Sequence, residues 1–262
     1  MTGLGDRFAE LVAKPEPAIP LDEAALVIAA HAYPGLDIAA QLARLDQLAD
    51  GCPEPTLDGL RRHLFDELGF TGNGVRYADA RNSFLNCVLD RKVGIPISLA
   101  LVMMEVGRRI GVVLEGVGMP GHFLVRHLRE PPVLVDAFSG GRTLDAEGAE
   151  ALFRRLHGDG APFSPDLLAP ARPRAILTRM LANLRHLYAY AGDATSTGWV
   201  LRLRAAIPAE DIHELADLAG VQASLGRFNE AAATLDAIAD QLPDSRADRA
   251  RAQAKLLRSR LN

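Results

Sequence analysis

Three segments between residues 77 and 141 decide the fold of this chain. They read YADARNSFLNCVLDRKVGIPISLALVMMEVGRRIG at 77–111, GVGMPGHFLVRHL at 116–128 and VLVDAFSGG at 133–141. Residues 97–110 are apolar on every side except at three charged positions, which predicts a helix buried at the centre of a domain. The two later segments contain short apolar runs that predict strands. The sequence therefore predicts an α+β domain in which a small antiparallel sheet packs on a buried helix.

Two ionisable residues, His122 and Asp136, lie on these strands among apolar neighbours. A polar group buried without a partner costs about 1–3 kcal/mol, so each needs one. A carboxylate that accepts from one imidazole nitrogen fixes the tautomer and leaves the other nitrogen as a base. A symmetric hairpin about residues 130–131 would pair His122 with Ser139 and leave Asp136 on the opposite face, whereas one bulge residue would bring it to the same face. The spacing permits the pair without requiring it, and by itself favours a structural role for His122.

A nucleophile to complete such a pair is harder to find. Ser98 lies in the first turn of the buried helix, where unpaired amides favour an oxyanion, but a serine there is more often a capping group. Cys87 lies among apolar residues, where cysteine usually acts as a small core side chain. Both residues are candidate nucleophiles, and for both the structural role is favoured.

The other motifs do not predict a cofactor or a metal site. Residues 116–121 match the pattern G-x-G-x-x-G, but a strand follows them, where dinucleotide binding needs a helix. The sequence contains no P-loop, no G-x-S-x-G elbow and no paired-cysteine zinc pattern. Its seven histidines lack the spacing of a helical metal site. We therefore expect no cofactor.

Composition indicates which partners to expect. The net charge of −4 and the pI near 6.0 provide no electrostatic footprint for nucleic acid, and the basic residues at 246–260 are typical of a solvated helix face. No signal peptide is visible, and no apolar run approaches the roughly 18 residues of a membrane span. The two cysteines, Cys52 and Cys87, are too few for a disulfide scaffold. We expect a cytoplasmic protein that contacts neither membranes nor nucleic acid directly.

Helices are predicted on both sides of the central segments. The predicted helices cover 21–32, 36–49, 57–68 and 80–90, and the predicted strands cover 112–116, 121–128 and 133–138. A stretch rich in Pro, Gly and Ala at 158–173 indicates a domain boundary. We therefore expect an N-terminal helical segment at 1–70 packed on the core, a core domain at 71–160, and a helical region at 174–262.

The C-terminal region has a period close to that of a helical repeat. Gly192 and Gly226 are 34 residues apart, and Pro208 and Pro243 are 35 apart. Helix pairs with glycine between them and proline after the second resemble tetratricopeptide repeats. The unit at 211–243 fits this pattern best, and two units are too few for an independent solenoid. A plain helical bundle is the alternative.

Four motifs in order resemble the SirB-type transglutaminase-like family. They are YADARNSFLN at 77–86, GIPISLA at 94–100, PGHFLVR at 120–126 and DAFSGG at 136–141. The resemblance extends to Tyr33-Pro34, to the turn at 70–73 and to the segment 179–184, so it spans nearly the whole chain. Ala137 differs from the proline that the family pattern leads us to expect. These bacterial proteins carry the domain ahead of tetratricopeptide-like helices, and a related domain occurs in some F-box proteins.

The resemblance implies a papain-like transglutaminase core. Active members use a cysteine at the start of the central helix, followed by His and Asp on successive strands, and His122 and Asp136 match the last two. Counting from Ala100 and Gly111 places the cysteine position at Pro96, which has no thiol for acyl transfer. This substitution is typical of the family. The resemblance therefore implies the fold but not the activity.

Two functions of different classes are consistent with these residues. The favoured function is a non-catalytic protein-binding or regulatory module whose C-terminal helices bind an unidentified protein or peptide. Its cleft would be lined by Asn82, Asn86, Pro96 and His122. The alternative is a hydrolase or acyltransferase that uses Ser98 or Cys87 with the dyad of His122 and Asp136. A purely structural domain in a larger complex is a third possibility.

Overall fold

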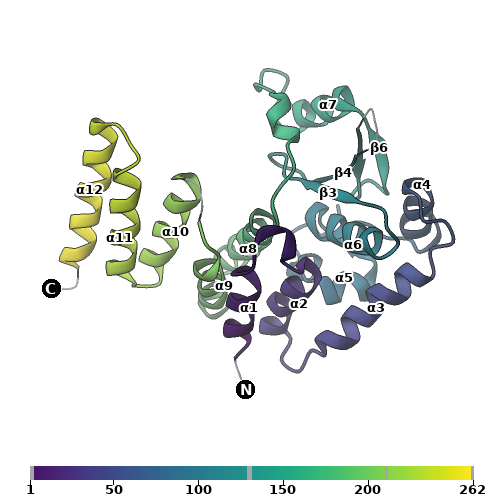
Figure 1. Cartoon of the computed structure of the whole chain (residues 1–262), viewed down its shortest axis with the longest axis horizontal. Coiled ribbons are helices and arrows are strands. Elements are labelled where there is room, and N and C mark those ends of the chain that lie inside the picture. The colour runs from purple at the N-terminus through teal and green to yellow at the C-terminus, as the bar shows by residue number, and fades with distance from the viewer. Residues whose placement is uncertain (1–2, 129–131, 210–211, 261–262) are drawn as a thin grey trace. The chain divides into compact units, whose positions relative to one another are not determined.

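A computed structural model describes residues 3–128, 132–209 and 212–260. Within these residues the chain divides into two compact units (Figure 1). We call Pro15–Asn183 the core unit, and Met1–Lys14 together with Leu184–Asn262 the helical unit. These units have boundaries other than the predicted ranges 1–70, 71–160 and 174–262.

Two helices account for the difference in boundaries. Helix α1 (Leu4–Val12) packs against α9 (Ala194–Ala206) and buries Phe8, Leu11 and Val12, so the chain's beginning belongs to the helical unit. Helix α8 (Pro173–Tyr190) contributes its first eleven residues, up to Asn183, to the core unit. The division into units therefore does not follow the order of residues along the chain, since the helical unit combines residues from both ends.

The core unit is a mixture of helices and two small sheets, which confirms the α+β class. Its elements are η1 (Glu16–Ala18), α2 (Leu21–Ala32), α3 (Ile38–Asp50), α4 (Leu57–Arg61), the π-helical turn η2 (Arg62–Glu67), β1 (Thr71–Gly72), η3 (Ala80–Asn82), α5 (Leu85–Arg91), β2 (Val93–Gly94), α6 (Pro96–Arg109), β3 (Leu114–Val117), β4 (Leu124–His127), β5 (Val133–Asp136), β6 (Arg142–Leu144), α7 (Ala146–His157), η4 (Pro165–Leu168) and the start of α8.

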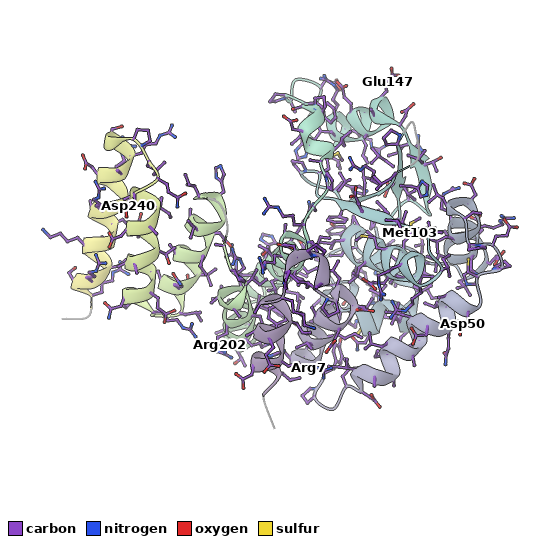
Figure 2. The ribbon with its side chains drawn as sticks, in the orientation of Figure 1. Arg7, Asp50, Met103, Glu147, Arg202 and Asp240 are labelled. Carbon is purple, nitrogen blue, oxygen red and sulfur yellow. The ribbon has the colours of Figure 1, made fainter. Side chains whose placement is uncertain are left out.

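Helix α6 forms the centre of the core unit. Eleven of its fourteen residues are buried, among them Met103, which Figure 2 labels and which has no exposed surface. Pro96 occupies the first helical position, where a missing N–H costs nothing. The Ser98 hydroxyl accepts a hydrogen bond from the Ile95 N–H at 3.1 Å and caps the helix. Helices α2, α3, α4 and α5 and strands β3 and β4 all pack against α6, as predicted for a helix that is apolar on nearly every side (Figure 1).

The charged residues at the end of α6 join it to neighbouring helices. Arg109 donates to Asp22 on α2 at 2.7 Å and to Asp46 on α3 at 2.7 Å, and Arg108 donates to the buried Glu105 at 2.9 Å. Burial raises the pKa of Asp22, but the hydrogen bonds and charge of Arg109 outweigh it, so the net pKa lies below its ordinary value. The three residues that interrupt the apolar pattern therefore each have a charged partner.

The larger sheet is antiparallel, with strand order β3-β4-β5-β6. It lies between two helices: α6 packs against β3 and β4, while Leu152 and Phe153 of α7 share a hydrophobic cluster with Leu124 and Leu134 of the sheet (Figure 1). Strand β6 and the short parallel pair β1–β2 were not predicted, because two or three residues carry no usable period.

The register of the β4–β5 pair differs by one residue from a symmetric hairpin about residues 130–131. Val125 pairs with Val135 and His127 with Val133, so five residues connect the strands, of which 129–131 lie outside the described residues. In this register Asp136 falls opposite Leu124, and His122 is two residues away from Leu124 on the same face. Within the described residues, the structure therefore has neither the symmetric pairing of His122 with Ser139 nor the bulge, and the odd-length connection brings His122 and Asp136 to the same side.

The C-terminal part of the helical unit is a series of antiparallel helices. After α9 come α10 (Ile212–Ser224), α11 (Phe228–Ala239) and α12 (Asp244–Ser259), each packed on the one before. Gly192 and Gly226 have positive φ angles of 70° and 72° in the turns after α8 and α10, which explains the glycine at both positions. Alanine fills much of the interior, with Ala231, Ala232 and Ala254 fully buried.

The described residues also bear on membrane contact and on the cysteines. Within the described ranges, no helix combines the length and the apolar character that crossing a bilayer requires. Cys52 is half-buried and Cys87 is buried, and both are free thiols.

Candidate functional site

A pocket of about 270 Å³ brings together the predicted site residues Pro96 and His122. It forms where the start of α6, the loop before β4 and the core part of α8 meet. The pocket is lined by Tyr77, Ile95, Pro96, Ile97, Gly121, His122, Phe123, Arg179 and Asn183. All of these residues belong to the core unit.

His122 and Asp136 form a buried hydrogen-bonded pair. Nε2 of His122 lies 2.8 Å from Oδ1 of Asp136, and the two residues are 7% and 3% exposed. An ionised carboxylate can only accept, so Nε2 carries the proton and Nδ1 is the ring nitrogen that can accept from another group. The geometry is that of an imidazole oriented by a carboxylate.

Asp136 accepts hydrogen bonds from the turn after β5 as well as from His122. The backbone N–H groups of Phe138 and Ser139 donate to Oδ1 at 3.1 and 3.2 Å, and the Ser139 hydroxyl donates to Oδ2 at 2.7 Å. Burial raises the pKa of Asp136, but the hydrogen bond and charge of His122 and the donors of Ser139 outweigh it. The net pKa therefore lies below its ordinary value of 3.8, and the carboxylate is ionised at neutral pH.

Phe138 extends this turn to the wall of the pocket. Its ring makes edge contacts with His122, at 6.1 Å between centroids, and with Tyr77, at 5.9 Å. Gly72 donates its N–H to the Phe138 carbonyl at 3.1 Å, and a Cβ at this glycine would lie 2.5 Å from the Phe138 ring. Strand β1 can approach the turn this closely only because residue 72 has no side chain. Sequence reasoning missed both Phe138 and the role of Gly72.

Neither candidate nucleophile lines the pocket. Ser98 is fully buried, and its hydroxyl donates to the Asn82 carbonyl at 2.6 Å. The Cys87 thiol on α5 donates to the hydroxyl of Tyr33 at 3.1 Å, and burial raises its pKa. Among the described residues, the imidazole of His122 is hydrogen-bonded to Asp136 and to neither Ser98 nor Cys87.

The two asparagines expected in the cleft lie outside the pocket lining. Asn82 is fully buried, accepts from Asn73 at 3.1 Å and donates to the Arg76 carbonyl at 2.7 Å, which holds the loop between β1 and η3 that contains Tyr77. Asn86 is buried, and its Oδ1 has no hydrogen-bond partner among the described residues. The structure thus brings Pro96 and His122 together and gives Asn82 a structural role in the adjacent loop.

Arg179 is the pocket residue that sequence reasoning did not assign to the site. Its guanidinium donates to the Met119 carbonyl at 3.0 Å and to the His122 carbonyl at 2.7 Å, and it lies 5.5 Å from the centre of the Phe123 ring. Burial lowers the pKa of Arg179, and the nearby Tyr77 partly offsets this effect. The available signal was the motif R-M-L-x-N-L at 179–184, which also contains the pocket residue Asn183.

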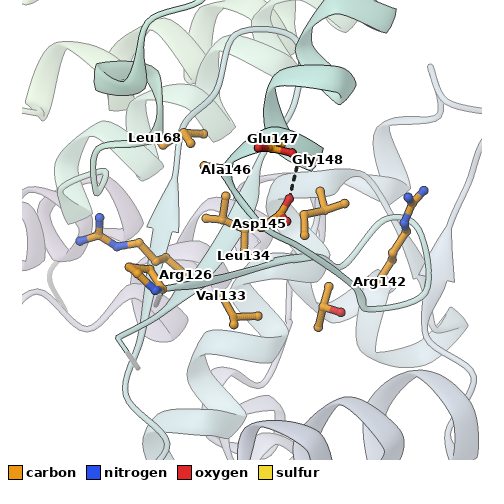
Figure 3. Close-up of a pocket in the computed structure, with 12 residues that line it drawn as sticks. Arg126, Val133, Leu134, Arg142, Asp145, Ala146, Glu147, Gly148 and Leu168 are labelled. Atoms are coloured by element: carbon orange, nitrogen blue, oxygen red, sulfur yellow. Dashed lines mark hydrogen bonds between the residues drawn. The ribbon is translucent and has the colours of Figure 1, made fainter. Parts of the chain in front are cut away.

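A larger pocket of about 750 Å³ lies elsewhere on the sheet, beside β5, β6 and the start of α7 (Figure 3). Arg126, Arg142 and Glu147 line it, and Asp145 caps α7 by accepting from the Gly148 N–H at 2.8 Å. It contains neither His122 nor Pro96. No group of three His, Cys, Asp or Glu side chains suited to a metal ion occurs in the described part of the chain.

The Asp136 carboxylate makes the stability of the fold depend on pH. Because its pKa is lower in the folded than in the unfolded chain, the ionised group stabilises the fold above its unfolded pKa, and this stability is lost as the pH falls through the folded pKa. We predict that Asp136→Asn lowers the free energy of unfolding by about 1–3 kcal/mol at pH 7, because the amide removes the charge and replaces one of the two accepting oxygens with a donor. Urea unfolding should show the difference from the original chain shrinking below pH 3.8.

The exposed Asp66 provides the matched control, since Asp66→Asn makes the same chemical change at the surface. It should alter the free energy of unfolding by less than about 0.5 kcal/mol. Equal stability of Asp136→Asn and the original chain at pH 7 would show that the hydrogen bonds of Asp136 do not support the fold.

Comparison with known proteins places the chain that has this site in a family. A model of the transglutaminase-like superfamily matches residues 32–182. A UPF0162 protein of Xylella fastidiosa is 42% identical over 184 residues, which are 65% of this chain and 66% of that protein. The UPF0162 protein PA3419 of Pseudomonas aeruginosa is 35% identical over 187 residues, 66% of each chain. The chain thus spans slightly less than two thirds of these bacterial relatives.

A third relative is much longer than the region it shares with this chain. F-box only protein 21 of Mus musculus is 34% identical over 140 residues, which are 50% of this chain and 21% of that protein. The family match covers the buried helix α6, the His122–Asp136 pair and the core part of α8 up to residue 182. This chain belongs to the transglutaminase-like superfamily.

Proposed function

We propose that this chain is a non-catalytic member of the superfamily that acts as a protein-binding or regulatory module. The observation that carries the proposal is Pro96, which lines the pocket beside His122 at the first position of α6. Nucleophilic acyl transfer needs a hydroxyl or thiol within hydrogen-bond reach of its base. Proline has neither group, so the oriented imidazole has no nucleophile to activate at this position.

The contacts of the other candidates support the same proposal. Ser98 uses its hydroxyl to cap α6 and to bond the Asn82 carbonyl, so turning it toward His122 would uncap the helix and orphan a buried acceptor. The Cys87 thiol has a raised pKa, which lowers its fraction of reactive thiolate. The alternative, a hydrolase or acyltransferase that uses Ser98 or Cys87, is favoured only by the intact pair of His122 and Asp136.

The interaction surface of this proposal is the helical unit. Its helix pairs, with glycine in the turns and proline after α9 and α11, support the assignment to tetratricopeptide-like repeats. Two large apolar side chains, Tyr190 and Leu256, are 91% and 58% exposed on this unit. The region shared with F-box only protein 21 is only 21% of that protein, which supports a role for this region there as one module among others. A protein or peptide in the cytoplasm is the proposed partner.

Restoring a thiol at the position of Pro96 tests whether only the nucleophile is missing. We predict that Pro96→Cys produces a thiol that reacts with iodoacetamide at pH 7 about tenfold faster than an ordinary peptide thiol. The cause is that the first turn of α6 and the adjacent His122 would both lower its pKa. The rate should be measured by mass spectrometry in a Cys52→Ser background, with Cys87 as an internal slow thiol.

The double variant Pro96→Cys, His122→Ala is the control, and in it the excess reactivity should fall. Ordinary thiol reactivity in Pro96→Cys with His122 intact would contradict the proposal. It would show that His122 does not act on a thiol at position 96. The lack of a nucleophile at that position would then no longer support a non-catalytic role.

The second part of the proposal concerns the last three helices. We predict that a chain ending at residue 207, which keeps α8 and α9, loses the proteins that the full chain captures by crosslinking. The full-length variant His122→Ala should retain them, because the contact surface is the helical unit. Circular dichroism and thermal melting establish that the shortened chain is folded. If a folded shortened chain retained every partner, the interaction surface would lie in the core unit instead.

A further inference from the structure

The pocket beside His122 contains a positive charge for which the described residues provide no neutralising carboxylate. Arg179 lines the pocket, and within the described residues its charged head forms no ion pair. Two of its N–H groups donate to backbone carbonyls, and the other N–H groups have no partner in the same part of the chain. A partly buried guanidinium of this kind is stabilised by an anion from outside the chain.

The rest of the lining favours an anion as well. Among the lining residues none is acidic, while Tyr77 offers a hydroxyl and Asn183 an amide, both able to donate. Ile97 lies in the first turn of α6, whose free N–H groups add to the positive potential. Asp136 does not line the pocket, and its oxygens accept hydrogen bonds from His122 and the turn after β5.

The size and the charge of the pocket indicate which anion. A volume of about 270 Å³ accommodates the end of a peptide or a side chain, and not a large ligand. One guanidinium matches one singly charged carboxylate, which it can bind with two parallel hydrogen bonds. A doubly charged phosphate would be left with an unbalanced charge in a partly buried site.

We propose that this pocket binds a peptide carboxylate through Arg179, with Tyr77 and Asn183 as further donors. The proposal rests on the proposed function, because it treats the position beside His122 as a place for a ligand and not for a nucleophile. The carboxylate belongs either to the C-terminus of a peptide or to an acidic side chain. Either source presents the same planar, singly charged group to the guanidinium.

NMR titration of the ¹⁵N-labelled full chain tests this proposal with three small probes. N-acetylglycine carries a terminal carboxylate, the α-amide of N-acetylglutamate carries only a side-chain carboxylate, and N-acetylglycinamide carries none. We expect saturable shifts at the Arg179 Nε–H and at the amides of Ile97 and His122 with at least one acid. The amide probe should produce none. The acid that binds more tightly identifies the source.

Variants separate binding at this pocket from general charge attraction. Asn183→Asp places a competing carboxylate beside Arg179 without removing the contacts of Arg179 to the backbone. It should lower the affinity for the acid probe about tenfold or more. Arg179→Gln should do the same, although it also removes the contacts to Met119 and His122. Arg185→Gln removes a cation that lies on the same helix outside the pocket, and should leave the affinity unchanged.

Two results would overturn the proposal. One is that neither acid binds more tightly than N-acetylglycinamide, which includes the case in which no probe binds. The other is unchanged affinity in a folded Asn183→Asp variant, which decides the matter even if Arg179→Gln does not fold. Neither result bears on the proposal that position 96 lacks a nucleophile, because that proposal is tested by the reactivity of Pro96→Cys, which involves no ligand.

Discussion

The hydrogen bond from Nε2 of His122 to Asp136 is the interaction on which the site depends. The same carboxylate accepts from the backbone and side chain of the turn after β5, so one buried anion fixes both the imidazole and the turn. That turn carries Phe138, whose ring contacts His122 and Tyr77 and lies against Gly72. Because the pKa of Asp136 is held below its ordinary value, this arrangement is charged and complete at neutral pH.

The pocket combines an oriented base with a position that cannot react. Pro96 begins α6 without a reactive side chain, and Ser98 is committed to the cap of that helix. Buried hydrogen bonds of this kind are expensive to break, so the arrangement does not rearrange easily into a catalytic one. Arg179 forms no ion pair within the described residues, and we propose that it holds an anion beside the same imidazole. Binding and acyl transfer make different demands on this pocket, and the role that we propose for its residues is binding.

Much of the core could be predicted from residue patterns alone. The long apolar run at 97–110 predicted α6 as a central helix, because a helix that is apolar on nearly all sides has to be buried. The family resemblance implied the pair of His122 and Asp136, but residue patterns alone could not predict it, since it depends on whether the connection between β4 and β5 has an odd or an even length. One residue in that connection decides which face Asp136 occupies.

The residues missed or placed elsewhere have a common physical cause. Arg179 reaches the His122 carbonyl across 57 positions of sequence, and no local pattern encodes a contact of that range. Asn82 was expected in the cleft because it belongs to a motif, but it is fully buried and holds the loop between β1 and η3 that contains Tyr77. Motif membership indicates that a residue matters, whereas only the tertiary structure shows whether it binds a ligand or supports the site.

The proposal that the chain lacks a working nucleophile can be tested directly on the unmodified chain. The protein would be incubated at pH 7 with a fluorophosphonate, which labels activated serines, and separately with iodoacetamide, and then analysed by peptide mass spectrometry. Our interpretation predicts that neither Ser98 nor Cys87 is labelled faster than in the His122→Ala variant. Stoichiometric labelling of either residue that disappears in His122→Ala would contradict it and establish a catalytic site.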